Sequence, residues 1–214
     1  GGARVAPALI ARARGLGLPV YEGYGLSECA SVVALNSPQA DRPGSVGRAL
    51  PHLGVRIAAD GEIVVSGSGF LGYVGQAFTG DELFTGDLGS LDAGGFLHVA
   101  GRRKHMLITS FGRNVAPEWP EAELLAGGAL AQAAVFGEGR PQLCAVLVPA
   151  PAASAAAIAA QVGAANARLP DYARIAHWVR AESPFAPHNG LATANGRVRR
   201  DAVWERYRER FDAL

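Results

Sequence analysis

The chain has 214 residues and a formal net charge of +1, and this length suits one large domain or two small ones, each with a core. Hydrophobic residues make up 49% of the chain and charged residues 18%, which argues against a disordered chain and against a coiled coil. The near-neutral charge argues against a general nucleic-acid binder. We find no apolar run long enough to span a membrane, and no signal peptide.

The two cysteines, Cys29 and Cys144, are far apart in the sequence, and neither has the spacing of a metal ligand. We interpret both as reduced thiols, which predicts a cytoplasmic protein. The chain begins with Gly1-Gly2 and no methionine. We therefore expect a piece of a longer protein.

The first 100 residues predict one helix followed by β-structure. A weak helical pattern over residues 5–17 ends at two glycines, and a short strand then leads into the glycine-rich stretch 23–25. Residues 36–54 are rich in Pro, Gly and Asn, which predicts a loop. Alternating apolar residues and Asp-Gly turns then predict a small, strongly bent antiparallel sheet, with strands at 55–57, 62–66, 88–91 and 96–99.

The second half predicts a compact α+β domain of about 110 residues, a usual domain size. Residues 106–109 and a glycine turn indicate a hairpin, and apolar periodicity predicts further elements at 117–125 (helix), 131–136 and 143–148 (strands), 152–168 (helix), 175–179 (strand) and 200–211 (helix). In the closing helix Trp204, Tyr207 and Phe211 recur at helical spacing, which favours a core stripe. The predicted fold class is thus mixed α/β and α+β.

The segment Tyr24-Gly25-Leu26-Ser27-Glu28 combines an aromatic ring, a hydroxyl and a carboxylate on a glycine-containing loop. A ring can stack on a base, a hydroxyl can donate to phosphate, and a carboxylate can hold Mg²⁺. Taken alone, the segment favours a turn that leads into a helix capped by Ser27.

The segment Thr85-Gly86-Asp87 places a carboxylate directly after a glycine. Such a carboxylate can accept hydrogen bonds from both hydroxyls of a ribose. The alternative is an ordinary turn aspartate.

Taken together, the motifs form an ordered series along nearly the whole chain: GGA at 1–3, YGLSE at 24–28, RPGSVGRALP at 42–51, TGDLG at 85–89, GRRKHMLITSFGRNVAPEWPE at 101–121 and NGRVRRDAV at 195–203. This series resembles the adenylate-forming superfamily, which includes acyl-CoA synthetases, peptide-synthetase adenylation domains and beetle luciferases. The stretch LITSFGRNVAPEWPE is most similar to the long-chain acyl-CoA synthetase branch.

The resemblance implies a role for each matched position in the first half. Tyr24 would stack on adenine, Ser27 would contact the adenylate phosphate, and Glu28 would bind Mg²⁺. Asp87 would hold the ribose hydroxyls with help from Arg102. The implied nucleotide-binding set is Gly2, Ala3, Tyr24, Gly25, Asp87 and Arg102.

The resemblance also implies a division of the chain at a hinge. Residues 1–100 would be the C-terminal end of the large AMP-binding domain, residues 101–104 the hinge with Lys104 as its pivot, and residues 105–214 a small mobile domain. That domain would swing between an adenylating and a thioester-forming pose. In the second pose Gly112 would let pantetheine pass close to the backbone.

One position departs from the family pattern. The closing motif of the family has a lysine after its glycine, and here the pair is Gly196-Arg197. The lysine would donate to the carboxylate and the α-phosphate while negative charge develops. Arginine keeps the charge but is a wider, planar fork. Arg197 is therefore either the catalytic cation or an arginine that reflects a bias against lysine, since Lys104 is the only lysine in the chain.

The implied activity is that of an ATP-dependent ligase that adenylates a carboxylic acid, expected to be fatty, and transfers the acyl group to coenzyme A. Alternatives are an acyl-AMP ligase that loads an acyl carrier protein, and a non-catalytic nucleotide-binding or interaction module. The phosphate loop of the family is absent from the chain, so we expect the chain alone to be inactive.

Overall fold

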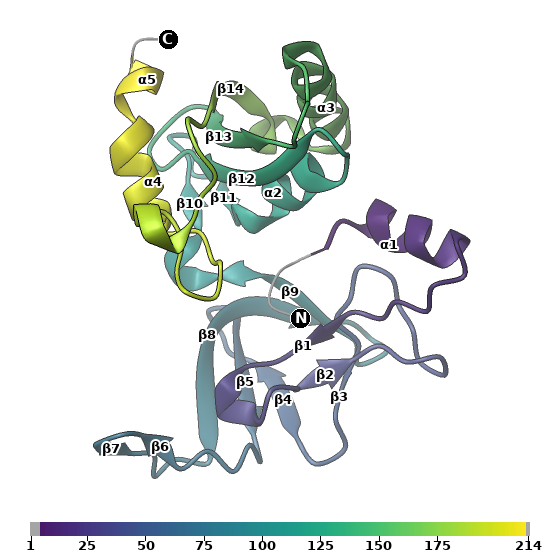
Figure 1. Ribbon diagram of the computed structural model, residues 1–214. Coiled ribbons are helices and arrows are strands. Elements are labelled where there is room, and N and C mark those ends of the chain that lie inside the picture. The colour runs from purple at the N-terminus through teal and green to yellow at the C-terminus, as the bar shows by residue number, and fades with distance from the viewer. Residues whose placement is uncertain (1–4, 213–214) are drawn as a thin grey trace. The chain divides into compact units, whose positions relative to one another are not determined.

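The computed structural model describes residues 5–212, so the nucleotide-site predictions for Gly2 and Ala3 lie outside the described residues. The chain divides into two compact units, Gly1–His105 and Met106–Leu214. Figure 1 traces the chain through both units, each of which is described by itself below. Among residues 5–212, none of the helices has both the length and the apolar character that crossing a bilayer requires.

The first unit is built on two small antiparallel sheets. One consists of β1 (Gly23–Tyr24), β2 (Ala34–Leu35) and β3 (Arg48–Ala49). The other has the order β4-β5-β8-β9 and consists of β4 (Gly54–Ile57), β5 (Glu62–Ser66), β8 (Glu82–Leu91) and β9 (Leu97–Arg102). The remaining elements are α1 (Pro7–Gly15), η1 (Ser27–Cys29), the hairpin of β6 (Gly72–Tyr73) and β7 (Gln76–Ala77), and η2 (Arg103–His105).

The bent antiparallel sheet that the sequence predicts is confirmed, and β8 and β9 curl as ribbons in Figure 1. Its core contains Ile63, Val65 and Leu97, all essentially inaccessible to solvent. One expectation was too short. β8 begins at Glu82 rather than at residue 88, so Thr85-Gly86-Asp87 lies within a strand. The loop predicted over 36–54 contains the short strand β3 and the start of β4.

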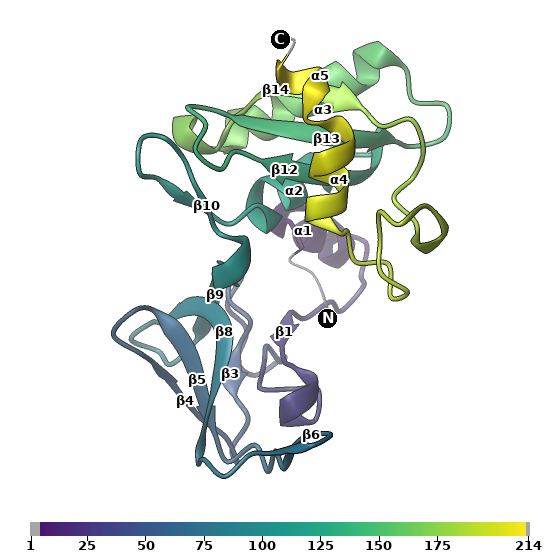
Figure 2. The same cartoon turned by 90° about the vertical axis from the view of Figure 1, so that its left-hand side faces the viewer.

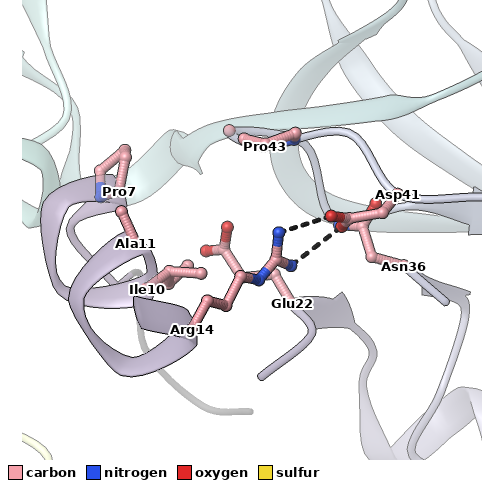
Figure 3. A pocket seen from close by; sticks show the side chains of 9 residues that line it. Pro7, Ile10, Ala11, Arg14, Glu22, Asn36, Asp41 and Pro43 are labelled. Carbon is pink, nitrogen blue, oxygen red and sulfur yellow. Dashed lines mark hydrogen bonds and ion pairs between the residues drawn. The ribbon is translucent and has the colours of Figure 1, made fainter. Parts of the chain in front are cut away.

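A double ion pair joins α1 to the loop before β3. The Arg14 guanidinium contacts both carboxylate oxygens of Asp41 (Figure 3). It also donates to the Val20 carbonyl. Beside this pair, α1 and the loop enclose a pocket of about 160 Å³, lined in part by Ile10 and Asn36. None of the candidate site residues that the structure describes lines it.

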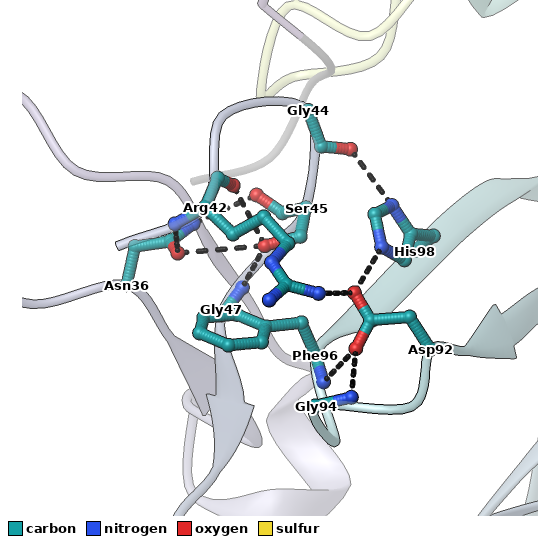
Figure 4. Close-up of polar contacts among 9 residues, drawn as sticks. All are labelled: Asn36, Arg42, Gly44, Ser45, Gly47, Asp92, Gly94, Phe96 and His98. Atoms are coloured by element: carbon teal, nitrogen blue, oxygen red, sulfur yellow. Dashed lines mark hydrogen bonds and ion pairs between the residues drawn. The ribbon is translucent and has the colours of Figure 1, made fainter. Parts of the chain in front are cut away.

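The RPGSVGR segment is fixed to the turn between β8 and β9 by a polar network (Figure 4). Asp92 accepts hydrogen bonds from the backbone N–H groups of Gly94 and Phe96, pairs with Arg42, and lies 3.1 Å from His98 Nε2. Burial of Asp92 opposes its ionisation, yet these hydrogen bonds lower its pKa well below the usual range. This motif therefore has a structural role in the first unit.

The second unit is a three-layer structure. Its sheet has the order β12-β13-β14, with β12 (Leu130–Phe136) antiparallel and β14 (Ile175–Arg180) parallel to β13 (Leu143–Pro149). The other elements are the hairpin of β10 (Leu107–Ile108) and β11 (Asn114–Val115), then α2 (Glu118–Leu125), α3 (Ala155–Arg168), η3 (Asp171–Ala173), η4 (Pro187–Asn189), α4 (Arg200–Tyr207) and α5 (Glu209–Asp212). In Figure 2, α4 lies across one face of this sheet.

Alternation along the strands produces two cores, one on each face of the sheet. In β13, Leu143, Ala145 and Leu147 face α2 and α3, whereas the intervening Cys144, Val146 and Val148 face α4 and α5. A strand buried on both faces accounts for its continuous apolar run. Apart from the closing helix, the predicted helices and strands of this half are confirmed.

The closing helix differs from its prediction. The structure divides it into α4 and α5, separated at Arg208. The predicted aromatic stripe is confirmed, because Tyr207 and Phe211 are buried and Trp204 packs against the same core. The Tyr207 hydroxyl also accepts a hydrogen bond from the Glu182 backbone N–H, at 3.0 Å.

Gly44 and Gly47 lie on one loop and differ in what a side chain would cost there: backbone strain alone at Gly44, and backbone strain with a steric clash at Gly47. Both have a φ in the left-handed region, +82° and +88°, but a Cβ on Gly44 meets nothing within 4 Å. A Cβ on Gly47 would lie 1.9 Å from the Leu35 carbonyl carbon. We expect Gly44→Ala to lower the free energy of unfolding by about 1–2 kcal/mol, and Gly47→Ala by about 1–3 kcal/mol more. Urea unfolding followed by circular dichroism measures both; equal effects would contradict the backbone clash.

Candidate active site

The TGD segment forms a bulge where β8 passes β5. The pairing of the two strands shifts between Glu62 and Val64, so residues 85–87 lie opposite a single residue, Ile63. Gly86 has a φ of +73°, and its N–H donates to Glu62 Oε1 at 2.7 Å. The Thr85 hydroxyl donates to the Ile63 carbonyl, at 2.8 Å, and accepts the Asp87 N–H, at 3.1 Å. The bulge therefore fixes the backbone of Asp87, and the alternative of an ordinary turn aspartate is wrong.

Three of the predicted site residues meet at this bulge. The Tyr24 hydroxyl donates to Asp87 Oδ2 at 2.6 Å, and Arg102 Nε lies 3.2 Å from Asp87 Oδ1. Asp87 and Arg102 are also directly paired in the ladder of β8 and β9. The Asp87 side chain is 14% exposed and that of Arg102 is 40% exposed. A carboxylate from one strand, a cation from the next and a phenol from β1 thus form one cluster.

Burial and the hydrogen bond to Asp87 together raise the pKa of Tyr24 well above that of a free tyrosine. The phenol is therefore protonated at neutral pH and acts as a donor. Among residues 5–212, one donor contacts each oxygen of Asp87, and a carboxylate has about four lone-pair directions in all. Asp87 consequently keeps acceptor capacity on both oxygens, which is what a pair of vicinal hydroxyls requires.

Glu28 lies on η1, a short 3₁₀ turn that follows the YG pair. Leu26 precedes this turn and no side chain caps it, so the expectation of a helix capped by Ser27 is wrong. The chain folds back so tightly that a Cβ on Gly25 would lie 1.8 Å from the Ser31 carbonyl oxygen. Only glycine fits there. Ser27 is exposed on the same turn.

The Glu28 carboxylate accepts a hydrogen bond from Tyr73, at 2.6 Å, on the hairpin of β6 and β7. This bond is the largest effect that lowers the pKa of Glu28, and the charge of Arg102 acts in the same direction. In the part of the chain that the structure describes, no group of three or more His, Cys, Asp or Glu side chains could hold a metal ion. A single ionised carboxylate fits Mg²⁺ that is held chiefly by nucleotide phosphates and water.

The other predicted residues lie at separate places. Lys104 is exposed on η2, where its neighbour Arg103 contacts Asp60 and Glu62. Gly112 lies in the turn between β10 and β11, with a φ of +71° and open space around its α-carbon. Arg197 is exposed on the loop before α4. The structure thus unites Tyr24, Asp87 and Arg102, whereas Gly112 and Arg197 belong to the second unit.

Sequence reasoning missed three residues around this site. Glu62, Thr85 and Tyr73 hold the bulge and Glu28 in place. Thr85 is part of the Thr85-Gly86-Asp87 motif, so the sequence did contain a signal for it. Tyr73 lies 45 residues from Glu28, and nothing in the local sequence pairs them.

Two family models match the chain. Residues 104–214 match the one described as the AMP-binding enzyme C-terminal domain, and residues 1–74 match the one described as AMP-binding enzyme. Because the first model covers more than half of the chain, the chain belongs to the AMP-binding enzymes of the adenylate-forming superfamily, as its motifs predicted.

CoA ligases are among the similar proteins of named function. The long-chain-fatty-acid–CoA ligase FadD15 of Mycobacterium bovis is 42% identical over 147 residues, which cover 65% of this chain and 24% of that protein. The putative fatty-acid–CoA ligase fadD11 of Mycobacterium tuberculosis is 29% identical over 94% of this chain and 40% of its own length. The chain therefore spans less than half of these relatives.

Solved structures give the same fold. The O-succinylbenzoate coenzyme A synthetase of Bacillus subtilis, in complex with AMP, has a TM-score of 0.74 and 28% identity, over 94% of this chain and 44% of that one. The same enzyme in complex with ATP and magnesium has a TM-score of 0.74 and 29% identity, over the same shares of the two chains. The predicted fold, the C-terminal end of a large domain followed by a small α+β domain, is confirmed.

The raised pKa of Tyr24 predicts how stability depends on pH. Tyrosines of an unfolded chain ionise near pH 10, whereas folded Tyr24 keeps its proton to higher pH. Unfolding then releases a proton, so the free energy of unfolding falls as the pH rises above about 10. We expect this fall to be shallower in Tyr24→Phe.

Urea unfolding at several pH values between about 9 and 11 measures the slope. Tyr172→Phe, which alters an exposed tyrosine, is the control and should keep the wild-type slope. Identical slopes for wild type and Tyr24→Phe would contradict the protonated, hydrogen-bonded phenol.

Proposed function

We propose that the whole protein is an ATP-dependent acid–thiol ligase that joins a fatty carboxylic acid to AMP and then transfers the acyl group to coenzyme A. The observation that carries this proposal is the cluster of Tyr24, Asp87 and Arg102, since it places an aromatic residue and a carboxylate with acceptor capacity beside a cation. The FadD relatives, named as fatty-acid–CoA ligases, support the acid and the thiol.

In this proposal the first unit binds the nucleotide. Tyr24 stacks on the adenine, Asp87 accepts the two ribose hydroxyls, and Arg102 orients the Asp87 carboxylate. Gly25 lets the chain fold back so that Ser27 and Glu28 face the phosphates. Mg²⁺ bound at Glu28 would neutralise phosphate charge when the carboxylate of the acid attacks the α-phosphate.

The second unit supplies groups for each half-reaction. Arg197 donates to the α-phosphate oxygens during adenylation, as pyrophosphate leaves. A swing about residues 101–104, with Lys104 as pivot, then brings Gly112 to the site. There the open space around its α-carbon leaves room for the pantetheine arm. The thiol attacks the acyl carbonyl, the thioester forms and AMP leaves. Cys29 and Cys144 are buried and not joined in a disulfide, which supports a cytoplasmic location.

Removing the Asp87 carboxylate should weaken nucleotide binding. Asp87→Ala deletes the acceptor for two ribose hydroxyls, and we expect a loss of about 1–3 kcal/mol in ATP binding by the full-length protein. Isothermal titration measures it. Asp81→Ala, at an exposed position of the same unit, is the control and should bind ATP as the wild type does. Unchanged ATP affinity in a folded Asp87→Ala protein would exclude Asp87 from the ribose site.

Substitution of Arg197 should separate the two half-reactions. We expect Arg197→Ala to slow ATP–pyrophosphate exchange by about 10²–10³-fold, the usual effect of losing one donor to a developing charge. Thioester formation from supplied acyl-adenylate should stay near the wild-type rate, and Arg197→Lys should match or exceed the wild type in exchange.

The matched control is Arg199→Ala, since Arg199 is an exposed arginine of the same segment, and it should alter neither half-reaction. If Arg197→Ala also alters neither, Arg197 is a surface residue. The alternative of a non-catalytic nucleotide-binding module would then be favoured.

A further inference from the structure

The loop that carries Arg197 is a short hairpin held by backbone contacts. Thr193 and Arg197 exchange two hydrogen bonds: the Thr193 N–H donates to the Arg197 carbonyl at 2.8 Å, and the Arg197 N–H donates to the Thr193 hydroxyl at 3.1 Å. At the base of the loop the Arg199 N–H donates to the Leu191 carbonyl at 2.9 Å. Leu191 is buried, whereas residues 193–197 are exposed. The direction of the exposed tip of the loop therefore depends on the contacts at its base.

Arg200 follows the base and is the first residue of α4. Its guanidinium forms a two-pronged contact with Glu121 of α2: Nη1 bonds to Oε1, and Nη2 lies 2.7 Å from Oε2. Glu121 also accepts the Val135 N–H of β12 at 2.8 Å. The two side chains are only 18% and 12% exposed. One residue thus connects the end of the loop to a helix and a strand of the sheet.

The apolar face of α4 already attaches this helix to the sheet through Val203 and Tyr207, both inaccessible to solvent. A buried ion pair adds little net stability to such packing, because desolvation of the charges offsets their attraction. Burial also opposes the charge of Arg200, although the hydrogen bonds and the charge of Glu121 raise its pKa overall. The contribution of the pair is geometric, since a bidentate guanidinium–carboxylate contact has one preferred orientation.

We propose that Arg200 is a positioning residue for Arg197: its contact with Glu121 fixes the direction in which the Arg197 loop leaves the sheet. This inference rests on the proposed role of Arg197 in adenylation. It assigns to Arg200 an effect on one half-reaction only, because Gly112, the residue proposed to act in thioester formation, lies on a different hairpin. A misplacement of about 1 Å can slow a reaction about 10²-fold.

The test uses Arg200→Lys in the full-length protein, because lysine keeps the charge and loses the planar fork. We expect ATP–pyrophosphate exchange to fall at least about tenfold, with thioester formation from supplied acyl-adenylate changed less than about twofold. In an Arg197→Ala background the same substitution should slow ATP–pyrophosphate exchange no further, because the effects of two residues that act as a unit are not additive.

The matched control is Arg168→Lys. Arg168 pairs with Glu123, also on α2, at 2.5 Å, with exposed fractions of 41% and 12%. It lies on α3 and is remote in sequence from the Arg197 loop, so its substitution should move neither half-reaction. If Arg200→Lys unfolds the protein, the pair Arg200→Met with Glu121→Gln removes both charges and keeps an acceptor for the Val135 N–H.

The outcomes separate the inference from the proposed function. If Arg197→Ala leaves exchange unchanged, the proposed role of Arg197 fails. If Arg197→Ala slows exchange but the Arg200 variants do not, only the positioning role is overturned. The same holds if the Arg200 variants slow both half-reactions equally, or if their effect on exchange adds to that of Arg197→Ala.

Discussion

The candidate site of the first unit depends on the bulge that places the Asp87 carboxylate between a phenol and a guanidinium. A regular strand would pair residues one to one, and here three residues of β8 pass a single residue of β5. Gly86 makes this possible through its left-handed φ, and the carboxylate of Glu62 and the hydroxyl of Thr85 satisfy the displaced N–H groups. The carboxylate is thereby held before any ligand arrives, so binding does not bear the cost of ordering it.

The two units differ in how firmly they hold their functional groups. In the first unit Tyr24, Asp87 and Arg102 are bonded to one another and partly buried. In the second, a sheet covered on both faces supports two exposed loop positions, Gly112 and Arg197. This division would suit the proposed reaction, in which one nucleotide stays bound while different groups approach it in turn. Loops on a rigid sheet can approach a reaction centre one after the other while the residues of that centre keep their arrangement.

The longer elements of the fold could be predicted from the sequence because they have local signals, whereas the short strands β3, β6 and β7 were not predicted. The continuous apolar run of β13 reflects burial on both faces, and the helical spacing of Trp204, Tyr207 and Phe211 reflects burial on one. The bulge has no such signal, since TGD is equally typical of a turn, and the contact between Tyr73 and Glu28 depends on where a hairpin lies in space. Motif resemblance named Tyr24, Asp87 and Arg102 together, whereas their hydrogen bonds came only from the structure.

The structure also bears on the arginine that replaces the lysine of the family. The hydrogen bonds that hold the 193–197 loop come from the backbone and the Thr193 hydroxyl, so none of them uses the Arg197 guanidinium. The fold therefore does not require arginine there, and a lysine would leave the loop unchanged. Arg200, three residues on, is the opposite case, since its planar fork matches both oxygens of a buried carboxylate. The exposed Arg197 and the paired, largely buried Arg200 therefore lie in different environments. Under the two proposals, a change of rate on exchanging arginine for lysine would report ligand contact at Arg197 and loop geometry at Arg200.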